Sequence, residues 1–171
     1  PDGSYTFSVL SYDSLNHSSS ATSGVQIDNT QPALSVGWTP SGTIVGGVVS
    51  FSAISTDTNG VNCVEFYLDG LLQRTDYSAP YEWTWDTALS SDGEHSVIVI
   101  ATDSRGNSKQ IILNLEVDNA YPSISVHSPA NQTMLAGPSS VVVRVTALDA
   151  TGIDTVSLSY YTGISWTTIP M

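Results

Sequence analysis

The sequence repeats itself at a distance of ninety residues, and this repeat limits the possible folds more than any other feature. Three pairs of dipeptides share the spacing: Asp2-Gly3 with Asp92-Gly93, Asp13-Ser14 with Asp103-Ser104, and Asp28-Asn29 with Asp118-Asn119. A later set, Asp57, Gly60 and Val64, returns ninety-two residues on as Asp149, Gly152 and Val156, which indicates a two-residue insertion. Similarity at a fixed period is typical of a chain that uses one structural unit several times.

The repeat also predicts where the units begin and end. Residues 1–31 correspond to the last third of a preceding unit, residues 32–121 form one complete unit, and residues 122–171 correspond to the first half of a following unit. We therefore expect the chain to be a piece of a longer array. A unit of about 90 residues has the size of a β-sandwich of about seven strands.

Alternating apolar and polar residues predict β-strands throughout the complete unit. In residues 48–55, Val49, Phe51 and Ala53 share one face, and serine residues stand on the other. Asp69-Gly70 is a tight hairpin signal. Further strands are expected at 34–38, 62–68, 71–75, 81–85, 94–102 and 109–117. No segment has a sustained helical period, so the sequence predicts an all-β fold whose inward faces are large enough for a core.

Charge excludes several kinds of partner. Four basic and sixteen acidic residues give a net charge of −12, whereas nucleic-acid binding and polybasic membrane attachment need a basic surface. No apolar run reaches the roughly 18 residues of a membrane-spanning helix. We therefore expect no nucleic-acid partner and no membrane insertion. The lone cysteine, Cys63, cannot form an intrachain disulfide bond.

Serine and threonine account for 45 of the 171 residues, and only 12% of the residues are charged. A surface kept soluble by hydroxyl groups rather than by charge favours an extracellular or cell-surface location. Two N-glycosylation sequons fit this location, one beginning at Asn16 and one at Asn131. Both lie in predicted loops, where an acceptor asparagine must be accessible.

Four ordered segments of the complete unit resemble the bacterial immunoglobulin-like domain family. They are Val64–Gly70 (VEFYLDG), Ala79–Thr87 (APYEWTWDT), Asp92–His95 (DGEH) and Ala101–Asn107 (ATDSRGN). The resemblance implies tandem Ig-like β-sandwiches. It also implies a spacer, adhesin or accessory module of a large secreted or surface protein, usually without catalysis.

Residues 2–7 have the spacing of the tyrosine corner of Ig-like domains, with Tyr5 as the tyrosine. His95 stands at the equivalent position of the complete unit. The sequence leaves open whether the corner hydrogen bond is made there.

The two unit junctions, around Asp28-Asn29 and Asp118-Asn119, resemble the Asp-Asn-x-x-Pro linkers of cadherin-like repeats. Calcium prefers six to eight oxygen ligands from carboxylates, amides and backbone carbonyls. We therefore name Asp57, Asp103, Asp118 and Asn119 as candidate calcium ligands at a unit junction. The alternative is that these residues form a turn before a proline. No cofactor is required by the fold.

Catalysis is not expected. The acidic residues fall mainly in turns, the three histidines are scattered, and no Gly-x-Ser-x-Gly motif is present. The stripe of Tyr81, Trp83 and Trp85 could stack on a sugar if it were exposed, but an alternating aromatic stripe in a sandwich favours the core.

The predicted function is a non-catalytic extracellular Ig-like repeat module that acts as a spacer or stalk of a larger surface or secreted protein. Its partners would be neighbouring Ig-like units. One alternative is a self-assembling filament or surface lattice, in which residues 1–31 and 122–171 of different copies complement each other's strands. Another is an adhesin module that binds a glycan or a protein.

Overall fold

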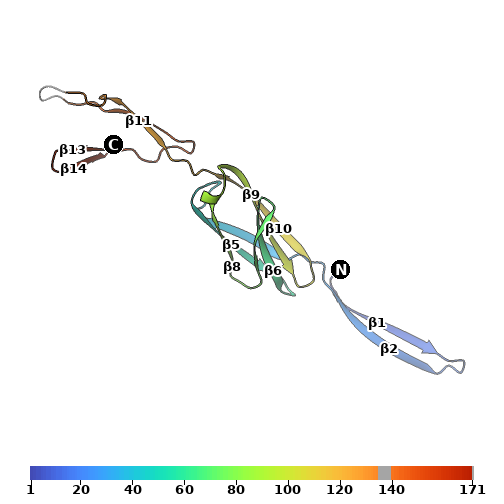
Figure 1. The fold of residues 1–171 in the computed structure, drawn as a ribbon. Helices are drawn as coiled ribbons and strands as arrows, with labels where there is room; N and C mark the ends of the chain where they lie inside the picture. Colours follow the sequence, from blue (N-terminus) through green and yellow to red (C-terminus); the bar gives the residue numbers. More distant parts are fainter. Residues whose placement is uncertain (135–139, 171) are drawn as a thin grey trace.

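The computed structural model describes residues 1–134 and 140–170. Within these ranges the chain consists of strands, turns and one short 3-10 helix, η1 (Thr87–Leu89). Three parts follow one another along an elongated molecule (Figure 1): an N-terminal hairpin, a central sandwich and a C-terminal group of strands. No helix in the described part of the chain is long and apolar enough to cross a membrane.

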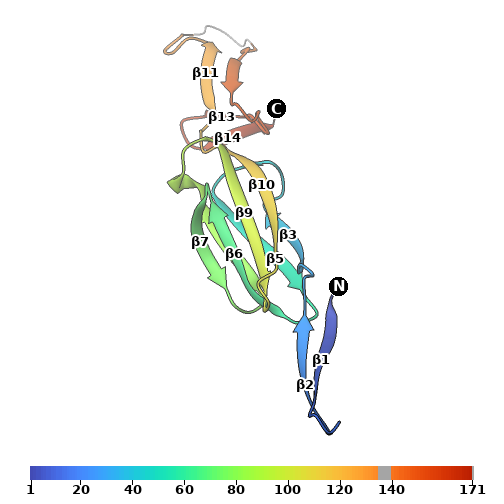
Figure 2. The ribbon, with the colours of Figure 1, turned by 90° about the vertical axis from the view of Figure 1, so that its right-hand side faces the viewer.

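The central part is a sandwich of two sheets (Figure 2). The first sheet has the order β3-β5-β8, with bounds Ala33–Thr39, Val48–Thr56 and Tyr81–Asp86. The second has the order β4-β10-β9-β6-β7, with bounds Ile44–Val45, Ser108–Val117, Gly93–Asp103, Val61–Leu68 and Leu71–Asp76. The pair β4–β10 is parallel and the other pairs are antiparallel. The prediction of an all-β Ig-like sandwich is therefore confirmed.

The core fills the space between these two sheets. Alternate residues of the central strands β5 and β9 point inward, as expected for a pleated sheet with one buried face. The first sheet contributes Val49, Phe51, Ala53, Tyr81 and Trp85, and the second contributes Val64, Phe66, Val97, Val99, Ala101, Leu115 and Val117. Trp83 packs against this core and stacks on Phe51 with ring centroids 5.2 Å apart. The aromatic stripe therefore belongs to the core rather than to an exposed sugar-stacking platform.

The N-terminal hairpin copies the last hairpin of the sandwich. It pairs β1 (Gly3–Tyr12) with β2 (Ser18–Ile27). Gly3 lies opposite Ile27, as Gly93 lies opposite Val117 ninety residues later, and the same offset holds along the whole hairpin. The hairpin therefore has the register of β9–β10 without the rest of a sandwich around it.

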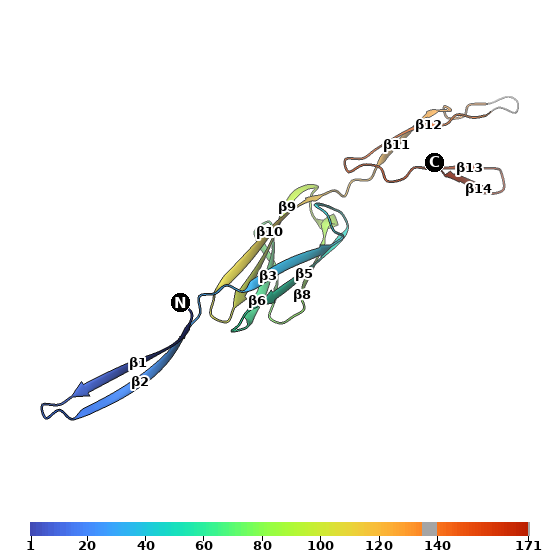
Figure 3. The same ribbon diagram turned by 180° about the vertical axis from the view of Figure 1, so that it is seen from behind.

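The C-terminal strands form two separate two-stranded sheets (Figure 3). They pair β11 (Ser123–Ser128) with β12 (Arg144–Leu148) and β13 (Ser157–Tyr161) with β14 (Trp166–Pro170). Val126 lies opposite Val145, as Val36 lies opposite Ala53, which reproduces the β3–β5 register with the two-residue insertion. The assignment of these strands to a following unit stays a prediction.

The tyrosine corner is present in both copies. Tyr5 Oη donates to the carbonyl of Pro1 at 2.7 Å. His95 Nε2 makes the equivalent contact to the carbonyl of Ser91 at 2.8 Å. Histidine replaces tyrosine here without loss of the bond, because an imidazole N–H can donate to the same carbonyl.

Candidate functional site

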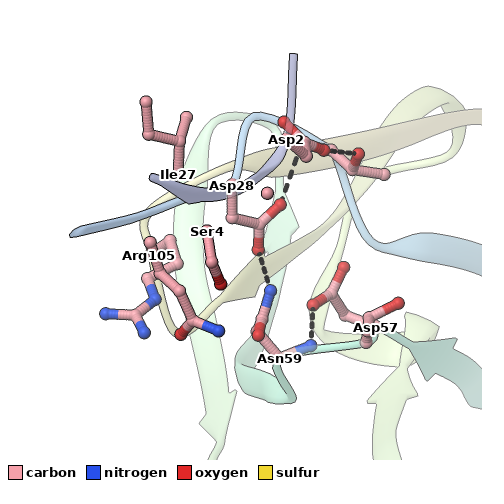
Figure 4. Close-up of a pocket in the computed structure, with 11 residues that line it drawn as sticks. Asp2, Ser4, Ile27, Asp28, Asp57, Asn59 and Arg105 are labelled. Atoms are coloured by element: carbon pink, nitrogen blue, oxygen red, sulfur yellow. Dashed lines mark hydrogen bonds between the residues drawn. The ribbon is translucent and has the colours of Figure 1, made fainter. Parts of the chain in front are cut away.

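Three aspartates meet where the N-terminal hairpin joins the sandwich. Asp28 follows β2, Asp57 follows β5, and Asp103 is the last residue of β9. Each offers a carboxylate oxygen, and these oxygens lie within 4.8 Å of one another. Figure 4 shows Asp28 and Asp57 on either side of Asn59. We call Asp28, Asp57 and Asp103 the junction triad.

Two members of the triad are held by the turns they begin. Asp57 Oδ1 accepts from the backbone N–H of Asn59 at 2.7 Å. Asp103 Oδ1 accepts from the N–H groups of Arg105 and Asn107, both at 2.8 Å. An aspartate that bonds to the backbone two residues later stabilises a turn without the help of neighbouring strands. Each of these two carboxylates is therefore oriented by its own turn.

Asp103 is the buried member, with 1% of its surface exposed. Its Oδ2 also accepts from Nδ2 of Asn107 at 2.8 Å. Burial raises the pKa of Asp103. Hydrogen bonds from the Asn107 side chain and from the backbone N–H groups of Arg105 and Asn107 lower it more, so the pKa lies below its ordinary value. Asp103 is therefore a charged group inside the protein at neutral pH.

Asp28 connects the triad to the sandwich. Its Oδ2 accepts from Nδ2 of Asn59 at 2.6 Å, and its backbone carbonyl accepts from Nδ2 of Asn107 at 3.2 Å. These bonds join residues 31 and 79 positions apart in the sequence. The end of β2 is thus fastened to two different turns of the sandwich.

Asp2 fastens the other strand of the hairpin. Its Oδ1 accepts from the N–H of Asn29 at 2.8 Å, and its Oδ2 accepts from the hydroxyl of Thr30. The bond from Thr30 is the main reason that the pKa of Asp2 lies below its usual value. Both ends of the hairpin are therefore tied to the linker that leads into β3.

An open pocket of about 340 Å³ lies beside the triad. Its lining includes Asp2, Ser4, Ile27, Asp28, Asp57 and Arg105 (Figure 4). Carboxylate oxygens of this kind suit a hard cation such as Ca²⁺, and the three aspartates of the triad are the residues that would hold it. The side chain of Arg105 brings a fixed positive charge to the same pocket.

Two family models match the chain. One, described as a bacterial Ig domain, matches residues 32–99, and the other, a bacterial Ig-like domain of group 3, matches residues 79–162. The chain belongs to the bacterial Ig-like domain family. The second match runs from β8 of the central sandwich into the C-terminal strands, so sequence of the Ig-like type continues past the end of β10. The Ig-like fold makes the chain a structural or binding module.

One solved structure with similarity to this Ig-like chain is titled "Structures of Clostridium thermocellum CbhA fibronectin(III)-like modules". The identity is 21% and the TM-score is 0.47, and the match covers 69% of this chain and 64% of that one. This chain therefore spans less than two thirds of the length of that structure. No curated protein matches the chain.

The Ig-like fold brings together two of the four predicted calcium ligands and separates the others. Asp57 and Asp103 lie in the triad, whereas Asp118 and Asn119 follow the far end of β10. That strand runs the length of the sandwich, so carboxylates at its two ends cannot share an ion. The candidate ligand that the sequence analysis did not name is Asp28. The repeat held the signal, because Asp28 is the counterpart of Asp118 on the linker that enters the unit.

Asn119 instead builds a joint at the far end of the Ig-like sandwich. Its N–H donates to Asp92 Oδ1 at 2.9 Å, which repeats the bond from Asn29 to Asp2 ninety residues earlier. Its side chain also exchanges hydrogen bonds with Thr87, at 2.8 and 2.9 Å. Asn119 is thus a structural residue of the second junction.

Asp118 caps the same junction. Its Oδ1 accepts from the N–H of Ala120 at 3.0 Å, as Asp28 Oδ1 accepts from Thr30 at 3.1 Å. Its Oδ2 is buried and accepts no hydrogen bond from the residues that the structure describes.

Both sequon asparagines of this Ig-like chain are exposed. Asn16 lies in the turn between β1 and β2, with a φ of 64°. Asn131 lies in the turn that follows β11. Their positions are accessible to a glycan, and their modification stays a prediction.

Proposed function

We propose that this chain is a non-catalytic spacer or stalk segment of a larger surface or secreted protein, built from Ig-like units joined end to end. The division into residues 1–31, 32–121 and 122–171 is part of this proposal. One observation carries it: Asp28, at the end of the hairpin, is hydrogen-bonded to Asn59 and Asn107 of the sandwich. The bond from Asn29 to Asp2 at the base of the hairpin also recurs ninety residues later, from Asn119 to Asp92.

The first junction favours a spacer because its bonds limit how the hairpin can turn relative to the sandwich. At the first junction, Asn29 bonds to Asp2, and Asp28 bonds to Asn59 and Asn107. At the second, Asn119 bonds to Asp92. Hydrogen bonds between segments distant in sequence limit bending at a linker, whereas a freely jointed linker makes none.

A catalytic role is not supported by the environment of the titratable groups. The three histidines lie apart: His17 bonds to Asp13, His95 to Asp69, and His127 to the hydroxyl of Thr146. In the junction triad, both oxygens of Asp103 already accept hydrogen bonds that hold a turn. Domains of this family are typically non-catalytic.

The extracellular location is supported by composition and family. Bacterial Ig-like domains are typically found in surface or secreted proteins. The exposed sequons at Asn16 and Asn131 and the surface rich in hydroxyl groups agree with this location. Calcium is an additional part of the proposal: an ion held by the junction triad would offset its clustered negative charge and stiffen the joint.

The spacer role is tested by NMR residual dipolar couplings. One alignment tensor should fit the couplings of both β1–β2 and the sandwich. In the double variant Asn59→Ala/Asn107→Ala, the hairpin couplings should shrink while those of the sandwich stay unchanged. Asn114→Ala, at an exposed position in the middle of β10, is the matched control. Separate tensors for the two parts of the unmodified chain would refute the proposal.

A further inference from the structure

A row of apolar side chains crosses the outer face of the larger sheet of the sandwich. Four residues on neighbouring strands form this apolar row, each directly opposite the next: Ile112 on β10, Ile98 on β9, Tyr67 on β6 and Leu72 on β7. The four strands lie side by side (Figure 2). Val97 and Val99, the neighbours of Ile98 along β9, are buried in the core, so Ile98 and its partners face away from it.

Both ends of the apolar row are open to solvent. Ile112 is 51% exposed and Leu72 is 52% exposed, and Ile98 and Tyr67 between them are partly buried. Ile100, two residues further along β9, widens the row on the same face. Single apolar residues on a surface are ordinary, whereas contiguous ones mark contact surfaces.

The repeat shows that the fold does not require these apolar residues. Ninety residues earlier, the positions of the two isoleucines of the row are held by Ser8 and Thr22, which lie opposite each other on β1 and β2. Ninety-two residues later, the position of Tyr67 is held by Ser159 on β13. Hydroxyl side chains therefore serve at the same strand positions, and strand pairing alone does not explain the apolar row.

The apolar row lies along the side of the molecule. It crosses β9 and β10 near their middles, whereas the hairpin and the C-terminal strands lie beyond opposite ends of the sandwich (Figure 1). Completing the units at those ends would not cover the row. Its exposure is therefore a property of the complete unit and not of the partial ones.

Acidic residues border the apolar row on both sides. Glu65 lies on the same face of β6, and one of its carboxylate oxygens accepts a hydrogen bond from the Tyr67 hydroxyl at 3.2 Å. On the other side of the row, Glu94 and Glu116 lie opposite each other on the same outer face. Lys109 is the one basic residue of β6, β9 and β10, which the structure describes in full. It lies opposite a buried residue of β9 and therefore stands on the other face.

We propose that the apolar row is a docking surface for another protein, whose contact segment offers apolar side chains flanked by lysine or arginine. Burial of the row supplies affinity, and the acidic border favours a basic partner over a like-charged one. A second copy of the chain would set one acidic border against another, and an anionic lipid surface would be repelled in the same way. This interaction goes beyond the spacer role and does not depend on it.

Selection from a phage-displayed library of random peptides, with the whole chain as bait, tests the proposal. Enriched peptides should combine aliphatic or aromatic residues with lysine or arginine. Their affinity, measured by calorimetry, should fall as NaCl is added, because salt screens the charges. It should fall about tenfold in the double variant Ile98→Ser/Ile112→Thr, which loses two aliphatic contacts. The hairpin carries serine and threonine at these positions, so circular dichroism should show this variant folded.

Ile54→Thr is the matched control. Ile54 is exposed on the outer face of β5, in the other sheet, and Thr146 stands at its position ninety-two residues later. This variant should bind the peptides as tightly as the unmodified chain does.

Several results would overturn the proposal. One is a library that yields no enriched peptide, and another is enriched peptides without basic residues. Equal binding to the double variant and to the unmodified chain is a third. Sedimentation velocity provides the fourth: oligomers of the unmodified chain that the double variant abolishes would make a second copy the occupant of the row.

Discussion

Nδ1 of His95 lies 2.6 Å from Oδ2 of Asp69 and ties the β6–β7 turn to β9. Asp69 and Gly70 form this turn with φ angles of 50° and 80°, which a two-residue hairpin with both central residues in the left-handed region requires. Nε2 of His95 contacts the carbonyl of Ser91, which only accepts hydrogen bonds. The Asp69 carboxylate accepts as well, so the doubly protonated imidazolium satisfies both partners.

This pair should make stability fall as the pH rises. The hydrogen bond to Asp69, followed by that to Ser91, raises the pKa of His95 above its ordinary value of 6.5. A group with a raised pKa in the folded state stabilises fully below its unfolded pKa, and the contribution is lost as the pH rises through the folded pKa. The free energy of unfolding, measured by urea denaturation, should therefore decrease as the pH is raised above 6.5.

His95→Gln is the control for this effect, because glutamine can still donate a hydrogen bond but does not titrate. Its stability should be flat over the same pH range. Trp85, whose ring centroid lies 5.5 Å from that of His95, provides a fluorescence signal for the titration. An equal decline in both proteins would assign the pH dependence to another group.

Gly46→Ala should destabilise the sandwich by about 1–3 kcal/mol, the usual cost of overpacking. A Cβ at this position would lie 2.7 Å from the carbonyl oxygen of Asp118, and a backbone atom cannot move aside cheaply. Gly37→Ala is the matched control, since a Cβ there meets nothing within 4 Å. Urea denaturation of both variants measures the difference. Equal stabilities would show that the backbone at Asp118 can shift away from the added Cβ without loss of stability.

Asp103→Asn should lower the free energy of unfolding by about 1–3 kcal/mol, because the buried carboxylate of Asp103 accepts hydrogen bonds that a neutral amide accepts less strongly. Its counterpart Asp13 holds the equivalent turn of the hairpin through Leu15 and His17, but in an exposed position. Asp13→Asn should change the stability of the sandwich by less than about 0.5 kcal/mol, as exposed substitutions usually do. Thermal unfolding followed by tryptophan fluorescence compares the two. A larger loss of stability for Asp13→Asn than for Asp103→Asn would contradict the view that burial makes the Asp103 turn the more important of the two.

Calcium should raise the melting temperature of the chain relative to a chelator, because an ion held by the junction triad binds only the folded state. Asp57→Asn should abolish the increase. Asp149→Asn removes the counterpart of Asp57 outside the triad and should keep it. Calorimetry with calcium or with EDTA measures the shift. The calcium part of the proposed function fails if the unmodified chain shows no increase.

Local patterns predicted the fold well and the junction only in part. Alternation placed Phe51 and Val49 in the core because a strand with one buried face leaves a two-residue period in the sequence. Asp57 and Asp103 were both predicted to lie at a junction because each begins a turn next to a strand end. The sequence could not show that Asp118 lies at the other end of the sandwich from Asp57 and Asp103, because a turn motif does not say at which end its strand stops.

The corner bond of His95 could not be predicted for a different reason. It depends on the distance from the imidazole to one backbone carbonyl, and no pattern of residue types encodes a distance. The exposure of β1–β2 could not be predicted either. The sequence of this hairpin alternates like that of a buried hairpin, so alternation alone cannot say that Phe7 and Val9 are exposed in this structure.

The last hairpin of the sandwich, β9–β10, closes the core and comes last along the chain. A unit of this kind that is synthesised from its N-terminus stays open until its final stretch of about thirty residues emerges. At ~5–20 residues per second this takes about 2–6 seconds. During that interval a neighbouring nascent chain can donate the wrong hairpin. The rate of synthesis, and not only the stability of the finished domain, therefore determines whether a repeat of this kind pairs with its own last hairpin or with that of a neighbouring chain.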